Sequence, residues 1–188
     1  MGNISEQLLK SSAEGEPVAI HYCIKQGADV NWKDAKNNSA LFIAAHCGNF
    51  EVADALINYK ADVNFRSDEG ATPLYQAAAH GHASVIRCLV TAKADLEAQT
   101  NNRTKPLNAA ARNGKVDGIR ALLEEGADVN SRNAMGATSL HLAVFASHEL
   151  CVQALLEHGA NTKLTIKKGA LAGTAPYEVC AAPPGRKR

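Results

Sequence analysis

The feature that most constrains this chain is an alanine that returns every 33 residues. Five alanines are spaced at this interval: Ala28, Ala61, Ala94, Ala127 and Ala160. The phrase ADVN starts at three of them, and ADLE starts at Ala94. A fixed period of this length is typical of a stack of small similar units, each built from the same few elements.

Each unit predicts a turn followed by two short helices. In the unit that starts at Ala61, the segment NFRSDEGA is rich in turn-forming residues. Thr72 is a suitable N-cap for the first helix, Pro73 fits its first turn, and Gly81 can take the positive φ that ends it. A second helix is expected in ASVIRCLVTA, because its apolar residues recur at helical spacing on one face.

Equivalent positions of the units carry apolar side chains of similar size. Two leucine columns and one small-residue column are Leu41, Leu74, Leu107 and Leu140; Leu56, Leu89, Leu122 and Leu155; and Ala45, Ala78, Ala111 and Val144. A single helix pair cannot bury its apolar stripe alone, so each unit is expected to cover the apolar face of its neighbour. The columns therefore predict an all-α solenoid held together by nearest-neighbour contacts.

Several motifs resemble ankyrin repeats. They are GATPLYQAAAHGH at 70–82, GATSLHLAV at 136–144, and GADVN at 27–31 and 126–130. The resemblance implies stacked helix-turn-helix units with projecting β-turns or hairpins. The tetrapeptide T-P-L-H of the family is altered in two units, which have Phe42 and Asn108 in place of the histidine. The hydroxyl-to-imidazole bond of that tetrapeptide is expected only between Thr138 and His141, and the two altered units are expected to rely more on packing.

The same period sets the expected organisation of the chain. Residues 5–182 form one ankyrin-repeat domain between a flexible segment 1–4 and a basic tail 183–188. The domain is divided into an N-terminal half-cap, four full repeats and a partial C-terminal capping repeat, which are 5–27; 28–60, 61–93, 94–126 and 127–159; and 160–182. The capping repeat is expected to carry an insertion in TIKKGALAG, because Gly173, Pro176, Tyr177 and Val179 follow four residues late.

Charge and composition exclude several classes of partner. The chain has 20 basic and 19 acidic side chains and a net charge of +1, which gives no electrostatic reason to expect nucleic acid or a membrane surface as the main partner. No apolar run approaches the roughly 18 residues of a membrane span, and the N-terminal sequence does not resemble a secretory signal. We expect a monomer that is located in the cytoplasm, and a nuclear location is the alternative.

The cysteines and histidines do not predict catalysis. Cys23, Cys88, Cys151 and Cys180 fall on periodic positions and are interpreted as small core side chains in a reducing compartment. His148 is interpreted as a solvated surface residue. No nucleophile elbow, phosphate-binding loop or zinc-ligand spacing occurs. The protein is therefore predicted not to be an enzyme, with no cofactor and no small-molecule substrate.

The predicted function is protein–protein interaction, as an adaptor, a scaffold or a target-occluding inhibitor. In proteins that this sequence resembles, partners lie along the concave face formed by turn tips and first helices. The equivalent residues here are Trp32, Lys33, Lys36, Asn38, His46, Cys47, Phe65, Arg66, Asp68, Glu69, His80, Gln99, Asn101, Asn102, Arg112, Asn113, Arg132, Met135 and Phe145. The alternatives are a structural spacer, or a repeat that binds a metal or ligand through His46, Cys47 and His80.

Two aromatic residues of this set leave alternatives open. Trp32 and Phe65 stand one period apart, and they either anchor a partner or pack on each other at the base of the turns. The resemblance also implies that Asn31, Asn64 and Asn130 tie each turn to its neighbour, and that Asn64 and Asn130 are candidates for asparaginyl hydroxylation.

Phe145 and Met135 are expected to form an apolar patch on the concave face. Equivalent first-helix positions carry His46, Ala79 and Arg112, which are compatible with water. A phenylalanine there exposes apolar surface with no role in folding. With a basic rim, such a patch is expected to accept an apolar anchor beside acidic groups of a partner.

Overall fold

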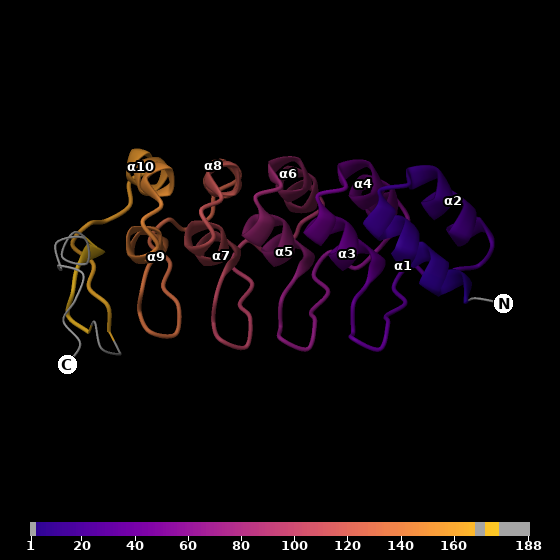
Figure 1. The fold of residues 1–188 in the computed structure, drawn as a ribbon, viewed down its shortest axis with the longest axis horizontal. Coiled ribbons are helices and arrows are strands. Elements are labelled where there is room, and N and C mark those ends of the chain that lie inside the picture. The colour runs from indigo at the N-terminus through magenta and orange to yellow at the C-terminus, as the bar shows by residue number, and fades with distance from the viewer. Residues whose placement is uncertain (1–2, 168–171, 177–188) are drawn as a thin grey trace.

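The structure, a computed structural model, describes residues 3–167 and 172–176 of the chain. In this part the chain forms helices in five consecutive pairs (Figure 1). The helices are α1 (Ile4–Glu14), α2 (Pro17–Lys25), α3 (Ala40–Cys47), α4 (Phe50–Asn58), α5 (Pro73–His80), α6 (Ala83–Thr91), α7 (Pro106–Arg112), α8 (Val116–Glu124), α9 (Ser139–Phe145) and α10 (Glu149–Glu157). None of these helices is long and apolar enough to cross a membrane.

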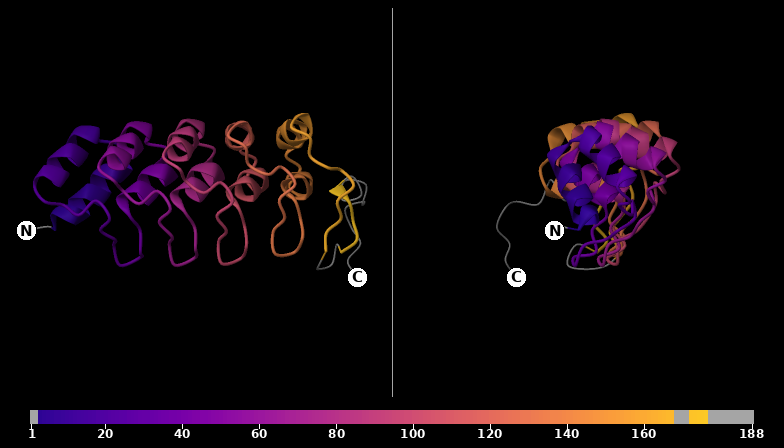
Figure 2. Two further views of the ribbon diagram at one scale, coloured as in Figure 1. Left: turned by 180° about the vertical axis from the view of Figure 1, so that it is seen from behind. Right: turned by 90° about the vertical axis from the view of Figure 1, so that its right-hand side faces the viewer.

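The units stack side by side in three tiers. In Figure 1 the second helices (α2, α4, α6, α8 and α10) lie along the top, the first helices lie below them, and the turns project downward. The end-on view in Figure 2 shows the turns of successive units extending on the same side. First helices pack on the first helices of neighbouring units, and second helices on second helices. This is the helical solenoid that the period predicts.

The boundaries of the first helices follow from capping. The Thr72 hydroxyl accepts a hydrogen bond from the backbone N–H of Tyr75 at 3.2 Å, and α5 begins at Pro73. Gly81 ends α5 in the left-handed conformation, with a φ of 82°. All three predicted roles are confirmed.

The N-terminal boundary differs from the prediction. α1 begins at Ile4, and the Asn3 side chain caps it by accepting a hydrogen bond from the N–H of Ser5 at 3.0 Å. The expected flexible segment 1–4 is therefore wrong for Asn3 and Ile4. The reason is the cap, because asparagine satisfies a free N–H of the first helical turn. Met1 and Gly2 lie outside the described residues.

The leucine columns form the core of the stack. All eight leucines are at most 2 % exposed, and the alanines of the small-residue column are fully buried. Val144, which continues that column, is half-buried and packs against the same cluster. Since consecutive units contribute to one continuous cluster, no unit has a core of its own.

Two of the periodic cysteines, Cys23 and Cys151, belong to this interior, whereas Cys88 lies at its edge, outside the core cluster. Cys23 and Cys151 are buried and Cys88 is half-buried, and burial raises the pKa of each thiol. A raised pKa leaves less thiolate at neutral pH, in agreement with a packing role. Cys180 lies outside the described residues.

The ends of the first helices are linked from unit to unit by side chains. The Nε2–H of His82 donates to the carbonyl oxygen of His46 at 3.0 Å, and His148 makes the equivalent bond to Arg112 at 3.1 Å. A Cβ atom on Gly48 would lie 2.5 Å from the His82 ring, so only glycine allows this approach. The interpretation of His148 as a solvated residue is therefore wrong, because its ring links two repeats.

A second series of links joins the bases of the turns. The side-chain oxygens of Asn31, Asn64, Glu97 and Asn130 each accept a hydrogen bond from a backbone N–H of the following unit. The four donor–acceptor distances lie between 2.8 and 3.0 Å. The implied role of these asparagines in tying each turn to its neighbour is confirmed.

The tetrapeptide of the fourth full unit forms its polar pair. Thr138 Oγ1 lies 2.8 Å from His141 Nδ1, as expected. In the third unit Asn108 is fully buried, accepts from the N–H of Lys105 at 3.2 Å and donates to Ser139 Oγ at 2.9 Å. That unit therefore replaces the missing pair with other hydrogen bonds, whereas it was expected to rely more on packing.

The last turn contains the expected insertion. In the full units a turn closes over four positions, for example from Ser67 N–H to Ala71 O. In the last turn Ile166 N–H donates to Thr174 O, so eight positions separate the same two groups and four are extra. Tyr177, Val179, the end of the capping repeat (160–182) and the basic tail 183–188 lie outside the described residues.

Candidate protein-binding surface

We call the surface formed by the turns and the first helices α3, α5, α7 and α9 the inner face (Figure 1). Most predicted partner-binding residues are exposed on it: Lys33, Lys36, His46, Cys47, Arg66, Asp68, Glu69, His80, Gln99, Asn101, Asn102, Arg112, Asn113, Met135 and Phe145. Trp32, Asn38 and Arg132 are half-buried, and Phe65 is buried. The structure thus brings the exposed residues onto one continuous side of the stack.

Phe65 is not available to a partner. It is 4 % exposed and packs edge-to-face on Phe42, with ring centroids 5.9 Å apart. The Lys33 ammonium lies 4.8 Å from the Phe65 ring centroid, while Trp32 packs against the main core. The anchoring alternative is therefore wrong for Phe65, whose aromatic partner is Phe42 of its neighbouring unit. Phe42 stands where the family has histidine, and packing replaces the polar pair there as expected.

Two arginines of the predicted set are occupied within the structure. Arg66 donates to the carbonyl oxygen of Gln99 at 2.6 Å. Arg132 donates to the carbonyl oxygens of Gly136 and Thr165, both at 2.8 Å. Each guanidinium thus joins its own turn to the following turn. Their hydrogen bonds stiffen the row of turns and leave these side chains less free to meet a partner.

The N-terminal half of the inner face carries a cluster of imidazoles. The ring centroids of His46 and His80 are 4.2 Å apart, and that of His82 lies 6.0 Å from His80. Cys47 is exposed beside them in sequence. In residues 3–167 and 172–176 no group of three or more His, Cys, Asp or Glu side chains could hold a metal ion. His46, Cys47 and His80 therefore do not form a metal-ligating group in this structure.

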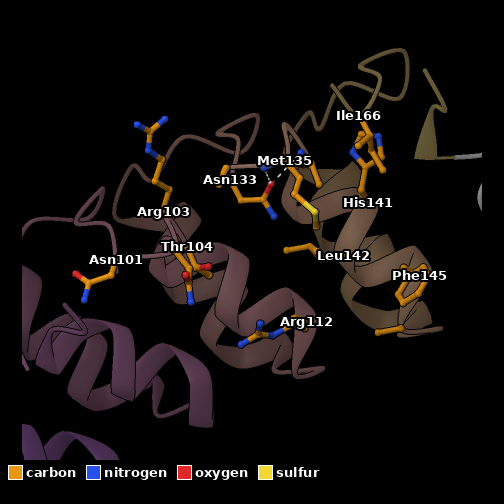
Figure 3. Close-up of a pocket in the computed structure, with 14 residues that line it drawn as sticks. Asn101, Arg103, Thr104, Arg112, Asn133, Met135, His141, Leu142, Phe145 and Ile166 are labelled. Carbon is orange, nitrogen blue, oxygen red and sulfur yellow. Dashed lines mark hydrogen bonds between the residues drawn. The ribbon is translucent and has the colours of Figure 1, made fainter. Parts of the chain in front are cut away.

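An apolar groove opens on the inner face between the third and fourth full repeats. Its volume is about 800 Å³, within the range of ligand-binding clefts. Figure 3 shows Met135 on the turn before α9, Leu142 on the side of α9 toward the preceding repeat, and Phe145 at the C-terminal end of α9. Phe145 is 71 % exposed and Met135 is 52 % exposed, so neither contributes to the core. Ile166 of the last turn also lines the groove, and its side chain is buried.

The charged groups of the groove are all basic. Arg103 and Arg112 are the fixed charges among its 14 lining residues, which include neither Asp nor Glu. His141 also lines the groove, and burial lowers its pKa, so it is neutral at physiological pH. The groove therefore combines an apolar wall with a positively charged one.

Sequence reasoning missed Arg103, Leu142 and Ile166. The signal for Arg103 was its column, in which the equivalent residues are Asn37, Gly70 and Gly136. All four adopt a positive φ, which is 54° for Arg103. A side chain other than glycine or asparagine in this conformation costs roughly 1–2 kcal/mol. An arginine in a column of Gly and Asn could thus have been singled out.

Asn64 and Asn130 lie at the bases of the turns, away from the groove. Asn64 is exposed and Asn130 half-buried, and both amide oxygens accept the inter-unit hydrogen bonds described above. Hydroxylation of either residue stays a prediction.

Comparison with known proteins identifies the repeat. The family model described as ankyrin repeats (3 copies) matches residues 8–100 and 86–166, which together cover most of the chain. A search of curated proteins finds no significant match.

Proposed function

Because this chain belongs to the ankyrin repeat family, we propose that it is an interaction module that binds a partner protein along its inner face. Repeats of this family are generally protein–protein interaction modules. A solenoid suits this use, since its stacked units present a long continuous surface while the core holds the scaffold rigid. The proposal includes no catalytic step.

The observation that carries this proposal is the exposure of Phe145 and Met135 beside an apolar groove. An apolar side chain that is more than half exposed contributes little to folding, but it becomes favourable when a partner covers it. Phenylalanine and methionine are also enriched at the cores of protein interfaces. The groove is therefore the proposed centre of the binding surface, and the polar residues of the inner face form its surroundings.

Photo-cross-linking in cells that express the protein tests the proposal. A benzophenone analogue of phenylalanine replaces Phe145, which keeps an aromatic ring at that position. The matched control places the same analogue at Leu150, which is 66 % exposed on α10. This helix is one of the second helices, which we call the outer helices because the first helices separate them from the turns (Figure 1). We expect a discrete cross-linked partner from position 145 and none from position 150. Equal cross-linking from both positions, or none from position 145, would refute the proposal.

A double substitution measures the contribution of the groove. Phe145→Ala with Met135→Ala is expected to weaken binding of the cross-linked partner by at least about 2 kcal/mol, as truncation of an interface centre does. The melting temperature should stay nearly unchanged, because both side chains are exposed. If the variant unfolds early and still binds when folded, the placement of the surface is wrong.

Binding at the groove suits two roles, an adaptor that joins partners or an inhibitor that covers its target. We place the protein inside the cell, since its buried cysteines Cys23 and Cys151 are unpaired thiols, as in a reducing compartment. Of the alternative functions, a structural spacer predicts no partner at the groove, so the cross-linking experiment also decides that alternative.

A further inference from the structure

We infer that the groove between the third and fourth repeats binds an extended acidic segment of a partner protein, with one apolar side chain inserted between Met135 and Phe145. This inference rests on the proposed function and adds the chemistry of the partner. Two independent properties of the groove support it: an exposed apolar wall, and a cationic wall whose charges have no partner in the described residues.

The apolar wall defines the anchor. Met135 and Phe145 are exposed, whereas Leu142 is half-buried behind them and Ile166 is buried at one end. A methionine and a phenylalanine can adapt to Leu, Ile, Met or Phe of a partner, since methionine is flexible and contacts aromatic rings favourably. The cleft is thus suited to a single aliphatic or aromatic side chain, and the exposed Met135 and Phe145 can reach that side chain from solvent.

The cationic wall defines the surroundings of the anchor. On the outer helices, Arg87 pairs with Glu124 at 2.7 Å and Arg120 pairs with Glu157 at 2.9 Å. Within residues 3–167 and 172–176, neither Arg103 nor Arg112 makes a salt bridge or a side-chain hydrogen bond. Their charges are therefore left for a ligand. Aspartate and glutamate complement them, and lysine or arginine would be repelled.

Other occupants fit less well. The segment 183–188 of this chain, PPGRKR, is basic and has the same sign of charge as the groove. A second copy of the chain would have to offer an apolar residue flanked by free carboxylates. The second helices do carry such a pair, because Leu150 is exposed beside the exposed Glu149, so the oligomeric state of the chain is measured as one of the outcomes below. An acidic segment of a different protein complements both walls at once.

Selection from a random peptide library tests the inference without assuming a sequence. The whole chain is immobilised, and peptides that also bind the Phe145→Ala, Met135→Ala variant are removed. We expect the remaining peptides to share one large apolar residue and to be enriched in Asp and Glu. The dissociation constant of an enriched peptide is then measured by fluorescence anisotropy at low and high salt. Its affinity should fall with salt, since exposed charge pairs are screened.

Two arginine substitutions separate the charge from the anchor. The double variant Arg103→Gly, Arg112→Gln is expected to weaken binding of the enriched peptide about tenfold, because it removes two exposed charge pairs. Lys93→Gly is the matched control. Lys93 is exposed, is basic and also has a positive φ, of 70°, so this change removes one positive charge and the same backbone strain as Arg103→Gly, away from the groove. It should leave peptide affinity unchanged.

The outcomes of these experiments are distinct. Enrichment of neutral or basic peptides, or equal losses in the arginine double variant and Lys93→Gly, would overturn the inference. If no peptide is enriched while position 145 still cross-links to a protein, the inference fails and the proposed function stands. If wild type is dimeric in solution and the Phe145, Met135 variant is monomeric, a second copy occupies the groove and the inference is again overturned.

Discussion

Substitution of Leu89 by alanine tests whether the leucine columns hold the repeats together. Leu89 is fully buried on α6, which packs on α4, α5 and α8. Because walls from three helices surround the side chain, the cavity left by alanine has little freedom to collapse. Leucine-to-alanine changes in protein cores destabilise by roughly 2.7–5.0 kcal/mol, with the larger values where a cavity persists. We therefore expect a loss of about 3–5 kcal/mol in the free energy of unfolding.

The expected change is large enough to measure. For a chain of this length each kcal/mol shifts the melting temperature by roughly 2–4 °C, so the drop should be roughly 6–20 °C. Urea unfolding followed by circular dichroism gives the free energy directly. Hydrogen exchange should show the first loss of protection in α4, α6 and α8, because repeats transmit damage to their nearest neighbours.

Leu150→Ala supplies the control for the same chemical change. Leu150 is 66 % exposed, so its truncation should alter the free energy of unfolding by no more than about 0.5 kcal/mol. If Leu89→Ala melted within about 2 °C of the wild type, or if Leu150→Ala were equally destabilising, the assignment of the columns as the core would be refuted.

Two further substitutions test the polar links between repeats. Asn108→Ala should cost about 2 kcal/mol in a urea unfolding curve, because it leaves the buried Ser139 hydroxyl and the Lys105 N–H without their partner; a change below about 0.5 kcal/mol would contradict this. Burial lowers the pKa of His82, so the unfolded chain binds a proton first, and part of the stability present above about pH 6.5 is lost as the pH falls below it. His82→Asn, which introduces the residue found at the equivalent position Asn49, should keep the melting temperature at pH 7.5 and reduce its fall between pH 7.5 and pH 5.5; an unchanged fall would refute the role of His82.

The sequence predicted the scaffold well because the scaffold is periodic. Leu41 and its equivalents stand at one spacing, and the same neighbours surround each of them, so one correct alignment places the whole column. The exposed position of Phe145 followed from the same comparison, since its equivalents are residues that tolerate water. Periodicity thus predicts which positions carry the same residue in every unit, as the core does, and which positions differ from unit to unit, as Phe145 does.

The remaining features depend on how side chains reach between units. Phe65 was not recognisable as buried, because its cover is Phe42, which lies in the preceding unit and interrupts the family pattern. His148 looked like a surface residue, yet its ring reaches back to the carbonyl oxygen of Arg112 at the end of α7, in the preceding unit. Ile166 closes the groove from the last turn, at a position where the equivalent residues Ser67, Thr100 and Asn133 are polar, so the repeat pattern gave no reason to expect an apolar side chain there. Such contacts require three-dimensional distances.

The links at the bases of the turns make the repeats interchangeable. In each joint the acceptor is a side chain of one unit, such as Asn31, and the donor is a backbone N–H of the next, such as that of Asp62. Every residue except proline has this donor, so the residue at the donor position can carry almost any side chain. A unit duplicated or deleted as a whole would find a suitable neighbour on both sides. Gene duplication can therefore lengthen such a chain in whole-repeat steps, with proline at the receiving position as the barrier.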